Sequence, residues 1–268
     1  MKLITLFSVL LFSFHLSLGQ QFGTIRYYAK YNILSPALQV SKDDAEYETE
    51  DAWLYFSGNN SLYQQKLNYT VTQVMRGPNG LEKKQIARPN PDKLDKIGAV
   101  YYKNMQTREL LYRENFTFSR EKYYTVRDTM TNIKWNITNE KKNIGKFVCR
   151  KAEANAFGRK WTAWFTTDIP LSIGPWKLWG LPGAILEATD ATNTYMFLFR
   201  EVDIPNLEAQ TKVKELKPSS DKFLSKNDLV KVYNQKKDEK RKYIMSILEE
   251  GGGSGAVEFK EEIEPYKQ

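Results

Sequence analysis

Thr167-Asp-Ile-Pro-Leu-Ser-Ile-Gly-Pro-Trp-Lys-Leu-Trp-Gly-Leu-Pro-Gly183 is the stretch around which this chain is organised. This Pro/Gly segment separates two aromatic strand patterns within a motif region that spans 161–202. Pro fixes φ, and Gly is preferred where the backbone must adopt a conformation that other residues avoid, so their crowding specifies the path of the chain narrowly. Pro182-Gly183 predicts the centre of a type II turn, because Gly accepts the positive φ of the third position. Gly174-Pro175 predicts a second bend.

The aromatic rings of the Pro/Gly segment allow two interpretations. Trp164, Trp176 and Trp179 lie close together in the sequence. Rings held on a rigid backbone make a recognition surface, since they offer contact area at a small cost in entropy. The same rings can instead form a plug that seals one end of a curved sheet, because buried Trp is common. Both interpretations stay open from the sequence.

The residues on both sides of the Pro/Gly segment have the period of two that is typical of β-strands. Residues 160–166 place Trp161, Ala163 and Phe165 on one face, and 184–189 with 194–202 predict a hairpin. The stretch 194–202 is apolar on both faces. It therefore predicts a central strand that is covered on both sides.

Further strand patterns precede this region and are separated by short polar or Gly-containing breaks. They cover 24–33, 53–57, 62–66, 100–105, 109–112, 123–127, 133–138 and 147–154. An acidic stretch, 41–51, is interpreted as a solvated connection, and 68–98 as a looser section of turns. Such spacing favours an antiparallel meander over strands that alternate with crossover helices. The expected fold is mainly β, a curved antiparallel meander sheet of half-barrel or open barrel-like form.

Helical patterns appear only after Pro205. Residues 207–216 predict a short helix, and 224–250 predict one long C-terminal helix with Ser225 or Asn227 as its cap. A Gly-rich hinge follows at 251–255. The expected organisation is a signal peptide at 1–19, an antiparallel β domain at 20–205, a helical extension at 206–250 and a flexible tail at 251–268.

The first nineteen residues have the composition of a secretory signal peptide. Lys2 precedes an apolar run from Leu3 to Leu18, and Ser17-Leu18-Gly19 supplies small residues before a cleavage point at Gln20. No later segment is long and apolar enough to predict a transmembrane span. We therefore expect an exported protein, periplasmic or extracellular.

Histidine and cysteine are nearly absent from the chain. The one histidine, His15, lies in the predicted signal peptide, and Cys149 is the one cysteine. Catalytic sites that depend on histidine, His-bearing metal sites and thiolate clusters are thereby excluded from the expected mature chain, and no intrachain disulfide can form. The net charge of +8 is spread along the chain, so no nucleic acid partner is expected. No metal and no cofactor are predicted.

Carboxylates near the Pro/Gly segment provide the alternative of a hydrolase or transferase. Asp168, Glu187 and Asp190 are the nearby acids. A pair of carboxylates can supply general acid and base groups if the fold brings them together across a cleft. Asp190 is interpreted most simply as a turn former, and Asp168 as a residue that pins the loop through backbone N–H groups.

The motif resembles that of a known family. Trp164-Phe-Thr-Thr-Asp-Ile-Pro170, Gly174-Pro175 and Gly180-Leu-Pro-Gly-Ala-Ile185 are similar to the GLPGLI family of exported Bacteroidetes proteins, with Ala184 where that family usually has Leu. Cys149-Arg-Lys-Ala152 and Gly158-Arg159 also resemble its upstream pattern. The family has no established activity or catalytic residues. The resemblance implies a companion of an outer-membrane receptor or transporter in the cell envelope.

These observations favour a non-enzymatic binding or accessory protein, with a carboxylate-dependent hydrolase or transferase as the alternative. The expected ligand is a peptide, an apolar molecule or an outer-membrane partner, held in an aromatic groove. No catalytic residue is assigned. The candidate binding residues are Trp164, Asp168, Pro170, Gly174, Pro175, Trp176, Trp179, Gly180, Leu181, Pro182 and Gly183.

Overall fold

The structure is a computed structural model that describes residues 22–32, 47–65, 71–76, 82–87, 95–116 and 119–250. The predicted signal peptide at 1–19 and the predicted tail at 251–268 lie outside these residues. Within them, no helix has both the length and the apolar character that a membrane crossing requires.

Eleven strands form one antiparallel sheet that is not closed. Its order is β8-β7-β6-β3-β2-β1-β13-β12-β11-β10-β9. The strands, in chain order, are β1 Phe22–Asn32, β2 Tyr47–Ser57, β3 Asn60–Gln65, β6 Ala99–Asn104, β7 Glu109–Phe116, β8 Ser119–Thr129, β9 Asn136–Ile144, β10 Phe147–Ala156, β11 Arg159–Thr166, β12 Ala184–Asp190 and β13 Tyr195–Asp203.

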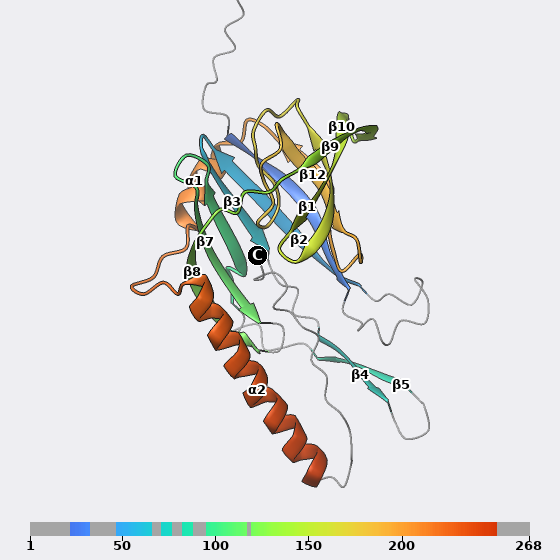
Figure 1. Cartoon of the computed structure of the whole chain (residues 1–268), viewed down its shortest axis with the longest axis vertical. Coiled ribbons are helices and arrows are strands. Elements are labelled where there is room, and N and C mark those ends of the chain that lie inside the picture. The colour runs from blue at the N-terminus through green and yellow to red at the C-terminus, as the bar shows by residue number, and fades with distance from the viewer. Residues whose placement is uncertain are drawn as a thin grey trace, which may run out of the picture.

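Three meanders build this sheet, and two pairings between distant strands join them. β3 pairs with β6, and β1 pairs with β13. The chain therefore crosses from one edge strand, β8, to the other, β9, between two consecutive strands. Figure 1 shows the resulting curve, in which β9 and β10 bend over the concave side of β1 and β2. The predicted mainly β, open and curved architecture is confirmed.

Alternation along the strands explains which face forms the core. On β1, Ile25, Tyr27 and Ala29 have no exposed surface, whereas Arg26 and Tyr28 between them are partly exposed or exposed. Successive side chains of a strand point to opposite faces, so one face of β1 packs inside the curve. The hydroxyl of Tyr27 reaches across the interior and donates to the carbonyl oxygen of Ile185, 2.7 Å away.

β13 lies near the centre of the sheet, as its composition predicts, but its outer face is not covered. Phe197 is buried, whereas Met196, Leu198 and Phe199 keep part of their surface exposed. The prediction that both faces of this strand are covered is therefore wrong. A central strand in an open antiparallel sheet can present one side to solvent.

Three local predictions also differ from the structure. The acidic connection ends earlier than expected, because β2 begins at Tyr47. The looser section at 68–98 contains two strands, β4 (Val71–Arg76) and β5 (Glu82–Ala87), which form a separate two-stranded sheet. β9 begins at Asn136 instead of Ile133, which is buried in the linker that precedes the strand.

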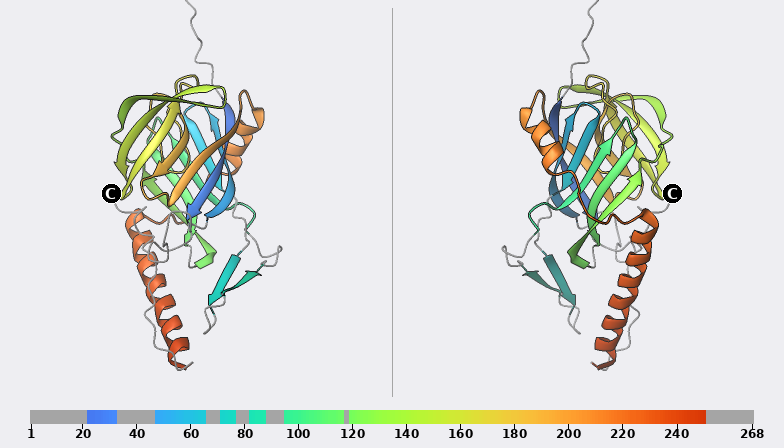
Figure 2. Two further views of the ribbon diagram at one scale, coloured as in Figure 1. Left: turned by 90° about the vertical axis from the view of Figure 1, so that its right-hand side faces the viewer. Right: turned by 90° about the vertical axis from the view of Figure 1, so that its left-hand side faces the viewer.

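Both predicted helices are present. α1 (Leu207–Glu215) packs on the outer face of the sheet, and the oxygen of the Asn206 side chain caps it by accepting from the backbone N–H of Ala209 (Figure 2). α2 (Lys226–Glu250) begins after Ser225, whose hydroxyl accepts from the N–H of Asp228. Ser225, and not Asn227, is therefore the cap.

The β8 edge of the sheet is covered by the residues that lead into α2. The backbone N–H of Leu224 donates to the carbonyl oxygen of Thr125, and its carbonyl oxygen accepts from the N–H of Arg127, each at 3.0 Å. Leu229 and Tyr233 on α2 have no exposed surface. The first turns of α2 are thus fixed to the sheet, and the helix then extends beyond it (Figures 1 and 2).

Candidate functional site

The Pro/Gly segment, residues 167–183, folds back against the start of β12. The backbone N–H of Ala184 donates to the carbonyl oxygen of Ile169 at 3.0 Å, and that of Ile185 donates to Ile173 at 2.9 Å. Four apolar residues of the segment keep at most 3% of their surface exposed: Ile169, Ile173, Leu178 and Leu181. The segment is therefore part of the core rather than a surface loop.

Trp176 shows that the Pro/Gly segment lies inside the curve of the sheet. Its ring centroid lies 6.3 Å from Tyr101 on β6, 5.9 Å from Trp161 on β11 and 6.5 Å from Tyr195 on β13. In the order of the sheet, β6 is separated from both β13 and β11 by at least three other strands, so only a ring on the concave side can touch all three. Phe157, in the turn between β10 and β11, adds an edge contact at 5.0 Å. Trp176 thus acts as the internal plug.

A buried lysine fixes the middle of the Pro/Gly segment. The Nζ of Lys103 on β6 donates to the carbonyl oxygens of Gly174, Trp176 and Leu178 at 2.6, 2.9 and 3.0 Å. Its side chain has no exposed surface. An ammonium group has three N–H donors, and all three are used here. Burial lowers the pKa of Lys103 to about 7.

A second lysine, Lys177, lies inside the same region of the protein. It is 4% exposed, and its Nζ lies 4.1 Å from the centroid of the Tyr112 ring. Burial lowers the pKa of Lys177, while the negative charges of Glu114 and Asp128 oppose that shift. The hydroxyl of Tyr101 donates to Glu114 nearby. The Lys177 ammonium therefore stands among aromatic rings, whose faces favour positive charge.

Sequence reasoning missed both lysines, although one of them has a signal in the sequence. Ala99, Tyr101 and Lys103 alternate along β6, so the period of two puts Lys103 on the buried face. A lysine at such a position needs acceptors inside the protein. Nothing in the sequence indicates that these acceptors are carbonyl groups 71 to 75 residues later.

The glycines of the motif serve close packing more than turn geometry. Gly183 does not have a positive φ, so the predicted type II turn at Leu181–Ala184 is wrong. A Cβ on Gly183 would lie 2.0 Å from the carbonyl oxygen of Thr166, and one on Gly174 would lie 2.8 Å from the Cδ1 of Ile185. Within the Pro/Gly segment, the residues that do adopt positive φ are Trp176 at 51° and Gly180 at 98°.

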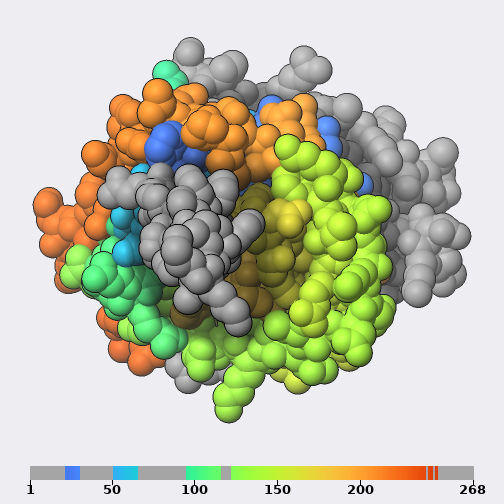
Figure 3. Space-filling view, turned by 90° about the horizontal axis from the view of Figure 1, so that it is seen from above, coloured from blue at the N-terminus to red at the C-terminus, as the bar shows by residue number. Residues whose placement is uncertain are grey.

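The exposed part of the motif forms a rim at the upper end of the plug. Trp179 and Trp135 are tied together, because Trp135 Nε1 donates to the carbonyl oxygen of Trp179 at 2.7 Å. Trp179 Nε1 donates to Thr131 at 2.8 Å, and the Arg108 guanidinium lies 5.2 Å from the centroid of the Trp179 ring. Figure 3 looks down on this end, where brown-gold atoms lie at the bottom of a hollow.

The eleven candidate residues do not form one surface. Trp179 is partly exposed at the rim, and so is Trp164, which instead packs against Lys142 with its ring centroid 4.6 Å from the Nζ. Trp176 is partly exposed within the plug. The exposed candidates are Asp168, Pro170, Gly180 and Pro182, and the buried ones are Gly174, Pro175, Leu181 and Gly183. The predicted groove lined by all three tryptophans is therefore not formed.

The three nearby carboxylates have separate environments. Asp190 is 2% exposed, pairs with the Arg159 guanidinium at 2.9 Å and accepts from the N–H of Tyr195 at 2.7 Å. It is a turn former, as predicted. Glu187 pairs with Lys142. Asp168 is exposed, and only its backbone N–H is bonded, to the Thr166 hydroxyl at 3.2 Å, so the predicted pinning by its carboxylate is not formed among the described residues.

The carboxylates therefore do not converge on a shared cleft. Among the residues that the structure describes, no group of three or more Cys, His, Asp or Glu side chains is placed so that it could hold a metal ion. Cys149 is buried without exposed surface, and burial raises the pKa of its thiol to about 11. A thiol with a raised pKa is a weak nucleophile at neutral pH.

Comparison with known proteins adds a short segment of sequence similarity and a distant structural similarity. No curated protein matches the sequence. Two solved structures, "Structure of PNGF-II in C2 space group" and "Structure of PNGF-II in P21 space group", are similar to the chain with TM-scores of 0.48 and 0.47 at 13% and 12% identity. Each similarity covers 76% of this chain and 31% of that chain.

The similarity to a family of proteins is confined to the motif. Residues 158–187 contain the turn residue Gly158, all of β11, the whole Pro/Gly segment and the first residues of β12. That segment matches the family described as "Protein of unknown function (Porph_ging)", which corresponds to the GLPGLI family.

Proposed function

We propose that this protein is an exported, non-enzymatic binding or accessory protein of the cell envelope, and that the rim of the Pro/Gly segment contacts its partner. The observation that carries the proposal is the pair Trp135 and Trp179. Both indole N–H groups are bonded to backbone carbonyls, so the rings are held in place while part of each stays exposed. Rings fixed before binding lose little entropy when a partner arrives.

The chemistry of the rim suits an extended peptide segment of a protein partner. Arg108 lies over Trp179, and two prolines of the same segment, Pro170 and Pro182, are exposed. Arg and Trp are the residues that contribute most often to binding energy at protein interfaces. The exposed prolines lack a backbone N–H, so they favour apolar contact over addition of a strand. The family resemblance suggests an outer-membrane receptor or transporter as the source of the peptide.

The alternative of a carboxylate-dependent hydrolase has no observation in its favour. It requires two acids that face one cleft, one of them with a perturbed pKa. Asp190 is engaged by Arg159, Glu187 by Lys142, and Asp168 lies exposed at the rim. Two of the three acids are therefore held by ion pairs, and the third is exposed to solvent.

The test is affinity capture from the native envelope, with purified wild type and two variants as baits. Trp179→Ala removes the central ring of the rim. Tyr28→Ala is the matched control, because Tyr28 is 38% exposed and carries the Arg200 guanidinium 5.0 Å from its ring centroid, on another part of the sheet. A protein recovered with wild type is then purified, and its affinity for each bait is measured directly.

We expect a partner that binds wild type and Tyr28→Ala alike and binds Trp179→Ala at least tenfold more weakly, a loss of roughly 1.4 kcal/mol or more. Equal affinity for all three baits overturns the assignment of the rim. Turnover of a substrate that Asp168→Asn abolishes overturns the non-enzymatic function itself.

A further inference from the structure

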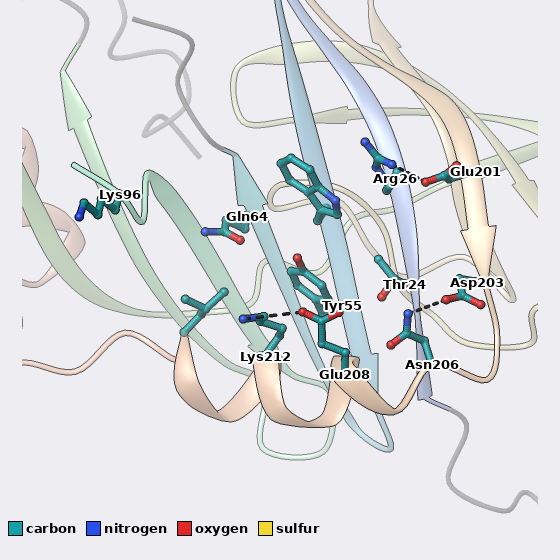
Figure 4. Close-up of a pocket in the computed structure, with 12 residues that line it drawn as sticks. Thr24, Arg26, Tyr55, Gln64, Lys96, Glu201, Asp203, Asn206, Glu208 and Lys212 are labelled. Atoms are coloured by element: carbon teal, nitrogen blue, oxygen red, sulfur yellow. Dashed lines mark hydrogen bonds and ion pairs between the residues drawn. The ribbon is translucent and has the colours of Figure 1, made fainter. Parts of the chain in front are cut away.

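A cavity lies on the outer face of the sheet, on the side opposite the Pro/Gly segment. Its volume is about 470 Å³, which is within the range of small-molecule sites. Strands β1, β2, β3 and β13 form its floor, and α1 forms one wall (Figure 4). Its lining includes Arg26, Trp53, Tyr55, Glu201, Asp203 and Glu208.

The wall formed by α1 is fixed to the sheet. Ala209 and Val213 are buried, and Val213 packs in a small cluster with Leu62, Val100 and Leu111. The cap at Asn206 holds the first turn of the helix. The cavity therefore exists before any ligand arrives. Folding has already ordered its walls, so a ligand loses little binding free energy in ordering them.

An aromatic floor with an available donor stands at the centre of the cavity. Trp53 and Tyr55 both project from β2, and Figure 4 shows Tyr55 between the polar residues of β1 and those of α1. The Tyr55 hydroxyl has no hydrogen-bond partner among the described residues. Burial, followed by the negative charge of Glu208, raises the pKa of Tyr55 to about 12. The hydroxyl thus stays protonated at neutral pH and can donate.

The charges that line the cavity balance. The cations are Arg26, Lys96 and Lys212, and the anions are Glu201, Asp203 and Glu208. Arg26 donates to one oxygen of Glu201 at 2.5 Å, and Asn206 donates to one oxygen of Asp203 at 2.6 Å. Each carboxylate keeps a second oxygen that can accept. Donors and acceptors therefore remain available without a net charge.

We propose that this cavity binds a neutral, polyhydroxylated ligand, that is, one or two units of a saccharide. A hydroxyl group both donates and accepts, which matches a lining that contains donors and acceptors side by side. The C–H faces of a sugar ring can pack on Trp53 and Tyr55. A phosphate would meet three carboxylates, and a polyamine would meet three cations, so both are disfavoured.

This site is separate from the rim, and its test does not depend on the partner proposed above. Binding is measured by isothermal titration calorimetry of the full chain with methyl β-glucoside, methyl β-galactoside, N-acetylglucosamine, maltose and cellobiose. Inorganic phosphate and spermidine serve as charged probes. The variants are Trp53→Ala and Tyr55→Phe, and the controls are Tyr28→Phe and Trp179→Ala. Circular dichroism confirms that each variant is folded.

We expect at least one saccharide to bind. Tyr55→Phe should weaken it roughly three- to tenfold, as loss of one hydrogen bond predicts, and Trp53→Ala more. Both controls should bind as wild type does, even if the rim proves to have no partner. The proposal is overturned if no saccharide binds, if phosphate or spermidine binds more tightly, or if binding survives both cavity variants.

Discussion

The Nζ of Lys103 and the carbonyl oxygen of Gly174 are hydrogen-bonded at 2.6 Å across 71 residues of sequence. This contact joins the end of β6 to the centre of the Pro/Gly segment, and two more carbonyls complete the set of acceptors. A buried cation and a loop without regular hydrogen bonding each carry a cost alone. Here the lysine donates to the loop carbonyls, so both sets of polar groups are hydrogen-bonded and the loop can be buried in the core.

Replacing this lysine should destabilise the protein strongly. Lys103→Met keeps the length of the side chain but leaves three buried carbonyl oxygens without their donor. Each such loss costs about 1 to 3 kcal/mol, offset in part because a buried charge is also removed, so we expect a net loss of about 2 to 5 kcal/mol. Urea unfolding measures it. Lys134→Met, at an exposed position, should change the stability by less than about 0.5 kcal/mol.

The stability should rise with pH above neutrality because of the same residue. In the folded protein Lys103 loses its proton near pH 7, whereas an unfolded lysine keeps it to about 10.4. Between these values the unfolded state binds more protons, so the free energy of unfolding increases with pH, by up to about 1.4 kcal/mol per unit.

Urea midpoints at pH 7, 8 and 9 check this dependence. Lys177, whose pKa is also lowered by burial, contributes in the same direction. The slope should therefore become smaller, but not vanish, in Lys103→Met. A stability that falls over this range, or a slope that is the same in the variant, contradicts the assignment.

Gly183 should tolerate no larger residue, for a reason of space and not of turn type. The added methyl of Gly183→Ala would lie 2.0 Å from a backbone oxygen, which cannot move aside without shifting β11. We expect a loss of about 3 kcal/mol or more. Gly58→Ala is the control, because its site has a φ of +55° and open space, so only backbone strain of roughly 1 kcal/mol applies.

The two tryptophans of the Pro/Gly segment should respond differently to truncation. Trp176→Ala opens a hole among four aromatic neighbours and should cost about 3 to 5 kcal/mol, a fall in Tm of roughly 6 to 20 °C. Trp179→Ala, at the rim, should cost less than half of that. Differential scanning calorimetry distinguishes them, and equal effects would show that Trp179 also belongs to the plug.

Cys149 should be inert in the folded protein. It is completely buried, and burial raises the pKa of its thiol to about 11. Iodoacetamide at pH 8 should leave it unmodified for hours in buffer and alkylate it in denaturant, as mass spectrometry reports. Rapid alkylation of the native protein would mean that the β10 region opens readily.

Strand content was predictable because it depends on neighbours along the chain. The alternation of Ile25, Tyr27 and Ala29, and the cap at Ser225, act over a few residues and are visible in the sequence. The three tryptophans were harder, because their spacing says nothing about which way each one points. Trp176 entered the interior, Trp179 stayed at the rim, and Trp164 joined Lys142 elsewhere.

The amino-acid sequence by itself determined a β-rich chain with a single histidine, a rigid Pro/Gly segment and a long final helix, because composition and short periods carry that information. Only the tertiary structure decided that this segment fills the inside of the sheet. The three carbonyls that accept from Lys103, and the residues that enclose the outer cavity, come from distant parts of the chain. Their proximity follows from the pairing of β1 with β13 and of β3 with β6, which no local pattern encodes.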